Sequence, residues 1–156
     1  MRKILIILAS FLLLLTGCNN SKVETIEETY IKELGYKIVS YEGELDKYTL
    51  DKSMLESGTE NIPYQQIWSL QEIKPEDYFG KEIITKKYIV KNHPLKEICE
   101  ETLLYLIINE GEIIGGYSFP NNDSVGGVYS IDGKTIEEVT GLSYKEWQQS
   151  LKEKHK

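Results

Sequence analysis

Hydrophobic and polar positions form blocks at the start of the chain. Arg2 and Lys3 precede an apolar run over residues 4–15, which ends at Thr16-Gly17-Cys18 and gives way to polar residues at 19–22. This order of charged, apolar and small residues is typical of a secretory signal. A transmembrane helix needs about 20 predominantly apolar residues. The pattern therefore predicts a removable signal over residues 1–17.

Periodic spacing begins after residue 22. Apolar residues recur at intervals of one, three and four over residues 23–34, which predicts an amphipathic helix with the stripe Val23, Ile26, Tyr30, Ile31 and Leu34. Gly35 can adopt the left-handed conformation that ends a helix. We expect a strand over residues 36–41 and a second short extended piece over residues 48–50.

The middle of the chain alternates between turn and periodic segments. Residues 51–61 are rich in Ser, Gly, Glu and Asn, which indicates irregular structure. Pro63 suits the first turn of a helix, so we expect a helix over residues 62–72, with one side formed by Tyr64, Ile67, Trp68 and Gln71. Residues 81–91 predict a strand that Asn92-His93-Pro94 ends.

The clearest expected hairpin lies in the second half. Two β-rich runs, residues 102–109 and 113–119, are joined by Glu110-Gly111-Glu112. Residues 103–108 are apolar without interruption, which indicates a central strand buried on both faces. A further strand is expected over residues 128–131, before the Asp132-Gly133 turn.

The C-terminal residues 143–154 predict a helix. Ser143 and Glu146 have the spacing of a capping box, and Tyr144, Trp147 and Leu151 recur at helical intervals. The fold class we expect is α+β: an antiparallel sheet of about four or five strands with N-terminal, middle and C-terminal helices. Residues 18–22 form a tether and residues 23–156 a single extracytoplasmic domain.

Charge narrows the range of functions. Removing residues 1–17 leaves 139 residues with 16 basic and 25 acidic side chains, a net charge of −9. Proteins that bind nucleic acids or anionic lipids through electrostatics need a basic face. We therefore expect no nucleic-acid partner.

The residues Leu15-Thr16-Gly17-Cys18 resemble the lipobox of bacterial lipoproteins, in which the cysteine receives a diacylglyceryl group. This resemblance implies lipidation at Cys18, the lipid bilayer as a partner, and a place on the extracytoplasmic face of the cell membrane. The alternative is an ordinary secreted protein with a chance cysteine near its cleavage site. With Cys18 acylated, Cys99 has no partner for an intramolecular disulfide, and we expect it to be buried rather than catalytic.

The mature chain shows no recognisable catalytic or metal motif. His93 is expected in a solvated loop at a strand end, and His155 lies beside the C-terminus. Metal sites need several ligands at compatible spacing, and no such spacing occurs, so we expect no metal and no cofactor. The acidic clusters at residues 97–101 and 137–138 suggest paired-carboxylate hydrolysis, but an acidic chain brings carboxylates together by chance.

Two glycine pairs, Gly115-Gly116 and Gly126-Gly127, flank an aromatic and polar stretch. The favoured interpretation is structural, because glycines within strands mark bulges or close backbone approach. The functional alternative is an aromatic contact surface formed by Tyr117, Phe119 and Tyr129, since aromatic residues contribute much of the binding energy at interfaces.

Three segments between residues 24 and 119 resemble a family of uncharacterised domains in lipoproteins and membrane-attached proteins of Gram-positive bacteria. The segments are Leu34-Gly35-Tyr36, the stretch from Phe79-Gly80-Lys81-Glu82 through Tyr88-Ile89-Val90 to Asn92 and Pro94, and the stretch from Leu103-Leu104 to Ile113-Ile114-Gly115-Gly116. The resemblance implies a fold but no chemistry, and residues from Gly126 onward depart from the pattern.

These patterns favour a non-catalytic binding or interaction module at the cell surface, with an envelope or membrane protein as a candidate partner. The alternatives are a cell-envelope hydrolase of unrecognised type, acting through Glu residues and His93, and an accessory subunit of a membrane transporter or sensor. The sequence does not separate the accessory subunit from the binding module, because the two differ only in the identity of the partner.

Overall fold

The computed structural model describes residues 23–56, 58–122 and 127–154. The expected signal over residues 1–17, the lipidation site Cys18 and the tether lie outside these ranges. Within them, no helix has the length and apolar composition required to cross a bilayer.

The described residues form an antiparallel sheet with five strands in the order of the sequence, which confirms the α+β fold class. The strands are β1 (Lys37–Thr49), β2 (Glu82–Lys91), β3 (Thr102–Asn109), β4 (Glu112–Pro120) and β5 (Tyr129–Ser130). Each strand pairs with the strands that precede and follow it in the sequence, so the order of the strands in the sheet is the order along the chain.

The predicted hairpin is confirmed as β3 and β4. Glu110 and Gly111 have positive φ angles of 51° and 83°, the conformation of a tight two-residue turn. β3 is the middle strand, and seven of its eight residues are buried, while Leu103 is partly buried. The uninterrupted apolar run therefore reflects burial on both faces, as expected.

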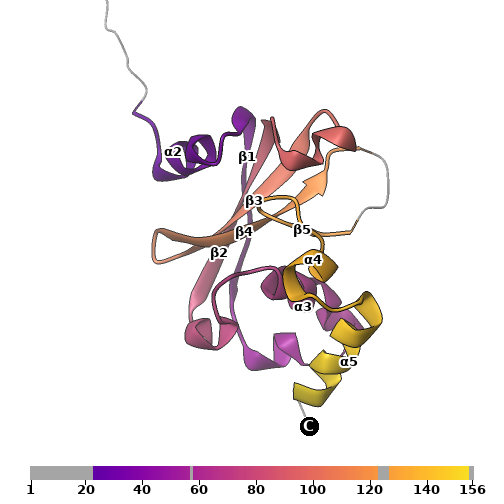
Figure 1. Cartoon of the computed structure of the whole chain (residues 1–156). Coiled ribbons are helices and arrows are strands. Elements are labelled where there is room, and N and C mark those ends of the chain that lie inside the picture. The colour runs from indigo at the N-terminus through magenta and orange to yellow at the C-terminus, as the bar shows by residue number, and fades with distance from the viewer. Residues whose placement is uncertain (1–22, 57, 123–126, 155–156) are drawn as a thin grey trace, which may run out of the picture.

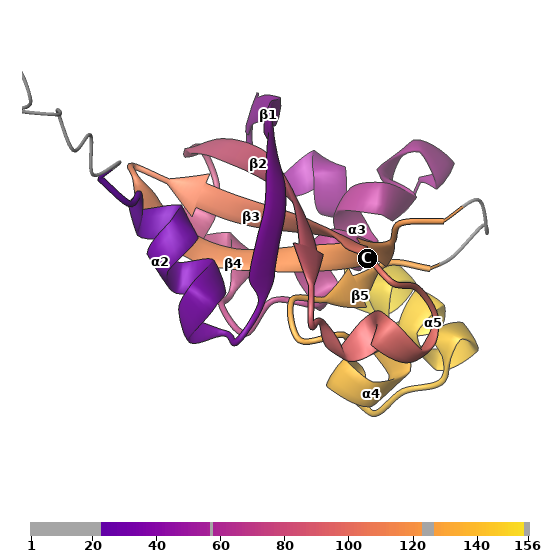
Figure 2. The same ribbon diagram turned by 90° about the horizontal axis from the view of Figure 1, so that it is seen from above.

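β1 differs from the expectation of two separate extended pieces. It is one strand of 13 residues, and its register against β2 shifts at three places, around Val39, Glu42 and Leu45. The polar residues between the two expected pieces hid the continuity. Bulges increase local twist, and Figure 2 shows β1 running steeply across β3 and β4.

Three of the helices lie where the sequence predicts them: α2 (Ile26–Glu33), α3 (Ile62–Ser69) and α5 (Tyr144–Lys154). Gly35 follows α2 with a φ of 83°, as expected. A further short helix, α4 (Ile136–Thr140), was not predicted, although Thr135 and Glu138 form a capping box at its start. Single 3₁₀ turns cover Lys52–Leu55, Thr59–Asn61, Pro75–Tyr78 and Pro94–Glu97.

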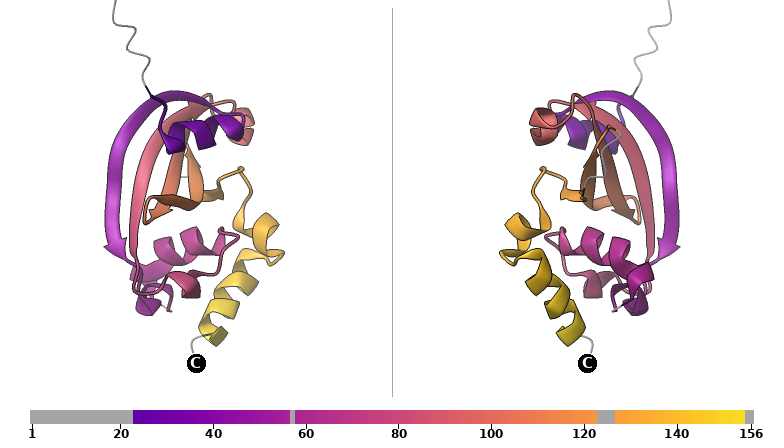
Figure 3. Two further views of the ribbon diagram at one scale, coloured as in Figure 1. Left: turned by 90° about the vertical axis from the view of Figure 1, so that its left-hand side faces the viewer. Right: turned by 90° about the vertical axis from the view of Figure 1, so that its right-hand side faces the viewer.

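The two faces of the sheet carry separate hydrophobic clusters, because side chains alternate along each strand. On β3, Leu104, Leu106 and Ile108 pack with Ile31 of α2. The opposite face presents Tyr105 and Ile107, which belong to a larger cluster with residues of α3, α4 and α5. The two sets of helices are also separated along the sheet: Figures 1 and 3 show α2 near one end and α3 and α5 near the other.

Candidate functional site: a cleft between α3 and α5

A cleft of about 650 Å³ opens beside the larger hydrophobic cluster, between the segment that follows β1 and the C-terminal helices. This volume lies within the range of small-molecule sites, about 300–1,000 Å³. Its apolar lining residues come from five segments of the chain: Leu55, Trp68, Ile73, Phe79, Leu142, Trp147 and Leu151. The site therefore forms only when α5 packs beside α3.

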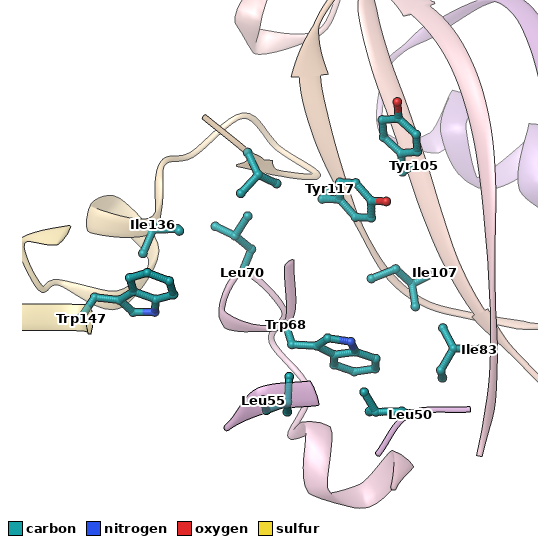
Figure 4. Close-up of a cluster of buried hydrophobic side chains, with 11 residues drawn as sticks. Leu50, Leu55, Trp68, Leu70, Ile83, Tyr105, Ile107, Tyr117, Ile136 and Trp147 are labelled. Carbon is teal, nitrogen blue, oxygen red and sulfur yellow. The ribbon is translucent and has the colours of Figure 1, made fainter. Parts of the chain in front are cut away.

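Trp68 of α3 and Trp147 of α5 form the two aromatic walls, and each is only 3% exposed. Trp68 Nε1 donates to the Tyr48 hydroxyl at 3.2 Å, and Trp147 Nε1 donates to Ser69 Oγ at 2.9 Å. Figure 4 shows Trp68 among residues of the sheet and Trp147 beside Ile136. Because both indole nitrogens are bonded within the protein, the rings are held in fixed orientations.

Gln71 joins the cleft to the sheet. Its Nε2 donates to Ile67 O at 2.6 Å, and its Oε1 accepts from the Gly116 N–H at 2.9 Å. A Cβ on Gly115 would collide with this Oε1, and a Cβ on Gly116 would lie 2.6 Å from Tyr105 O. The structural interpretation is confirmed for Gly116, because its close approach to the backbone of Tyr105 leaves no room for a Cβ.

Gln65 is the most buried polar residue in the lining, at 6% exposed. Its Nε2 donates to Glu56 O at 2.5 Å, which fixes the orientation of the amide. No group in the described ranges donates a hydrogen bond to its Oε1. Gln65 and Leu151 also line an adjoining groove of about 330 Å³. The two hollows thus share a wall that carries a buried acceptor with no donor among the described residues.

Lysines predominate among the charged residues around these two hollows. Lys52 and Lys74 border the larger cleft and Lys152 borders the groove, whereas Glu76 is the one acidic residue in the two linings as described. The chain as a whole has 25 acidic and 18 basic residues. The rim therefore has the opposite charge bias to the protein, which favours an anionic ligand.

A second hollow of about 640 Å³ lies between α2 and the start of β1. Its lining is mainly polar and charged, and Glu24 and Lys32 within it form an ion pair. Tyr36 and Ile38 supply the apolar part of this lining. Ligand sites are lined mainly by apolar side chains, so the cleft between α3 and α5 is the stronger candidate.

The structure does not present the three predicted contact residues as one exposed surface. Tyr117 is 7% exposed, stacks on Tyr105 with ring centroids 4.7 Å apart, and packs against the edge of Phe119. Burial also raises its pKa. Tyr117 of the alternative aromatic surface is therefore mostly buried, because its ring lies on the face that the helices cover. Phe119 and Tyr129 are half-buried, and a binding role for them stays a prediction.

The expectation that His93 is solvated is also wrong. His93 is 1% exposed, its Nδ1 accepts from the Leu95 N–H at 3.2 Å, and its Nε2 lies 3.0 Å from Ile131 O. A carbonyl oxygen only accepts, so Nε2 carries the proton. The ring also packs on Tyr36. Both ring nitrogens bond to backbone atoms, so His93 holds the loop before β3 against the end of β5.

Cys99 is buried, as expected, with its Sγ 3.6 Å from Leu95 O and 3.7 Å from Thr102 Oγ1. In the nearby acidic cluster, Glu100 and Glu101 both pair with Lys91. The Lys91 ammonium lowers the pKa of the Glu100 carboxyl. Among the residues with described positions, no three His, Cys, Asp or Glu side chains gather as a metal site.

Comparison with known proteins identifies no relative of this chain. No protein-family model matches the chain, and neither the curated proteins nor the solved structures contain a match. The candidate site therefore rests on the geometry of the cleft alone.

Proposed function

We propose that this protein is a membrane-anchored extracytoplasmic lipoprotein that acts as a non-catalytic binding module, with the cleft between α3 and α5 as its binding site. The observation that carries the proposal is the cleft itself: two fixed tryptophans, further apolar side chains and a buried amide oxygen without a donor in the described ranges. Concave apolar sites with a few oriented polar groups are typical of ligand binding.

The direction of the chain supports the anchored arrangement. A lipid on Cys18 would lie five residues before Val23, where the described chain begins and leads into α2. α2 and the two helices of the cleft lie near opposite ends of the sheet (Figures 1 and 3). A protein held to the bilayer at residue 18 would thus carry the cleft on its far end, accessible to partners in the envelope.

The hydrolase alternative that relies on His93 gains no support from the geometry. A general base needs a ring nitrogen within reach of the substrate. Both nitrogens of His93 bond to backbone atoms, and the side chain is almost fully buried. Binding without catalysis is therefore the function that we propose.

Substitutions on neighbouring positions of α5 test the binding site. Ser150 lines the cleft and its hydroxyl bonds only to Trp147 O in its own helix, whereas Gln149 is exposed. Ser150→Phe would fill the cleft, and Gln149→Phe adds the same ring outside it. Native mass spectrometry of the full chain released from its own membranes should detect a bound species in the unmodified protein and in Gln149→Phe. That species should be absent from Ser150→Phe. The same bound species in all three proteins, or none in any, would refute the proposal.

A further inference from the structure

We infer that the ligand of this cleft is a short peptide segment that combines apolar and acidic side chains. This inference rests on the proposed binding function and names the class of ligand. Three properties of the site support it: apolar walls, a pair of hydrogen-bonding groups one helical turn apart, and a lysine-rich rim.

The hydrogen-bonding pair matches a peptide backbone. Gln65 and Ser69 lie four residues apart on the same side of α3, so they are separated by about 6 Å along the helix axis. Groups on one edge of an extended peptide repeat about every 6.6 Å. Gln65 Oε1 can accept from a peptide N–H, and the Ser69 hydroxyl, which accepts from Trp147, can still donate to a peptide carbonyl.

The walls match apolar side chains. Trp68 and Trp147 belong to different helices, and the lining also includes aliphatic and aromatic side chains such as Leu55, Ile73 and Phe79. Among its polar residues, Thr140 and Gln71 already form hydrogen bonds within the protein. An acyl chain would also fit such walls. It would offer no donor to the Gln65 oxygen, which has none among the described residues, and this would weaken binding.

The rim matches acidic groups. Lys74 and Lys152 have no ion-pair partner among the residues with described positions, and Lys52 contacts Glu56 only at 4.0 Å. These ammonium groups are exposed, so they attract and orient an anionic segment more than they add affinity. A basic peptide with the same apolar residues would lack this attraction and meet repulsion.

Intrinsic fluorescence reports directly on the site, because Trp68 and Trp147 are the two tryptophans of the entire sequence and both wall the cleft. The experiment uses the full chain in lipid nanodiscs built with a tryptophan-free scaffold protein. Three probes are compared: a blocked hexapeptide in which leucine and phenylalanine alternate with glutamate, its counterpart with lysine in place of glutamate, and dodecanoate.

The glutamate peptide should change the tryptophan emission and bind at least about tenfold more tightly than the lysine peptide. Lys74→Glu should weaken binding of the glutamate peptide about threefold to tenfold, and the loss should shrink as salt is raised. Gln65→Met, which keeps the size of the side chain, should weaken it by a similar factor. Because Lys74 is exposed, its variant remains informative if Gln65→Met fails to fold.

Three results would overturn the inference: equal binding of the two peptides, no binding of either peptide, or binding of dodecanoate alone. Binding of dodecanoate alone would still identify the cleft as a binding site. It would support the proposed function and contradict the inference that the ligand is a peptide. The native mass spectrometry of the Ser150→Phe variant decides the proposed function independently of the peptide class.

Discussion

Gly116 of β4 pairs with Leu106 of β3 and has no room for a side chain. A Cβ at this position would be 2.6 Å from the backbone oxygen of Tyr105 and 2.8 Å from Ile131 Cδ1. Backbone atoms in a central strand cannot move aside without breaking the ladder. The same strand pair positions Gln71, whose Oε1 accepts from the Gly116 N–H. A change at this glycine therefore acts on both the core and the wall of the cleft.

The Gly116→Ala variant should lose about 1–3 kcal/mol of unfolding free energy, the usual range for overpacking a dense core. Urea denaturation followed by circular dichroism measures this loss. Gly127→Ala serves as the control, because a Cβ there meets no atom of the described residues within 4 Å. Equal midpoints for the two variants would contradict the close approach of β3 and β4.

His93 makes stability depend on pH. Burial lowers its pKa from 6.5, against the smaller opposing effects of the Ile131 hydrogen bond and Asp132. As the pH falls, the unfolded chain therefore takes up this proton before the folded chain does. The stability that the neutral ring contributes is complete above about pH 6.5 and decreases as the pH falls below that value.

Unfolding free energy should fall as the pH is lowered from about 6.5 to about 5.5, a range in which His is the side chain that titrates. His93→Asn should flatten this slope, because asparagine can still accept the Leu95 N–H but does not titrate. His155→Asn removes the other histidine and should leave the slope unchanged. An unaltered slope in the His93 variant would refute this assignment.

Single residues were the least predictable level of the structure. The Asn-His-Pro pattern correctly indicated the end of β2, but burial of His93 depends on Ile131 and Tyr36, which are distant in sequence. The sequence offered Tyr117 and Phe119 as part of an aromatic contact surface but did not indicate which side of β4 the helices cover. Gln65 has no sequence signal as a site residue, since a polar residue in an amphipathic helix normally faces solvent.

At the scale of elements, α5 lines the candidate site with Trp147, Ser150 and Leu151, and Trp147 is buried in the larger hydrophobic cluster. Its start is fixed by the predicted capping box: the Ser143 N–H and hydroxyl donate to Glu146 Oε2, and the Glu146 N–H lies 3.4 Å from Ser143 Oγ. Ser143 also accepts the first helical hydrogen bond, from the Trp147 N–H. The cap residue thus fixes the position of the Trp147 backbone, and the Trp147 side chain lines the cleft.

The Ser143→Ala variant should destabilise the protein by about 1 kcal/mol, the typical effect of losing a cap. Hydrogen exchange at the amides of α5 should accelerate more than exchange in β3. Lys145→Ala, at an exposed position of the same helix, should leave exchange in α5 unchanged. Uniform acceleration in α5 and β3 would show that α5 does not open independently.

Elements with a clear hydrophobic periodicity were predictable from the sequence. Elements that depend on contacts with distant segments were not. The hairpin of β3 and β4 follows from its own residues, as do the end of α2 before Gly35 and the start of α5 at Ser143. In contrast, α2 begins at Ile26 and not at Val23 as expected. β1 appeared as two pieces because its middle is polar and bulged at an exposed edge of the sheet, where no alternation of burial is imposed. α4 escaped prediction because five residues are too few to establish a helical period.

At the scale of the whole molecule, the fold separates the N-terminal end of the sheet from the cleft. β3 contributes side chains to the hydrophobic clusters on both faces of the sheet, so this one strand connects the two halves of the core. The sequence predicted the sheet and its helices, but not that the loops after β1 and the C-terminal helices would meet in a cleft. That meeting depends on packing between segments about 80 residues apart, such as Ser69 and Trp147.

The anchoring proposal predicts a change of location. Cys18→Ala should move the protein from the membrane fraction to the soluble or secreted fraction, or leave it as an unprocessed precursor of higher mass, because two acyl chains provide most of the membrane affinity. Immunoblots of fractionated cells measure both outcomes. Cys99→Ala is the matched control and should remain in the membrane fraction with the mass of the lipidated form. Membrane retention of processed Cys18→Ala would exclude lipid anchoring at this residue.

Photo-cross-linking in living cells tests the binding site most directly. A photoreactive phenylalanine would replace Ser150 within the cleft, Gln149 on the outer face of α5, or Tyr129 in the alternative aromatic surface. If the cleft is the binding site, irradiation should produce a specific adduct from position 150 and from neither of the other two positions. An adduct from position 129 with none from position 150 would contradict the cleft and restore the aromatic surface as the candidate site.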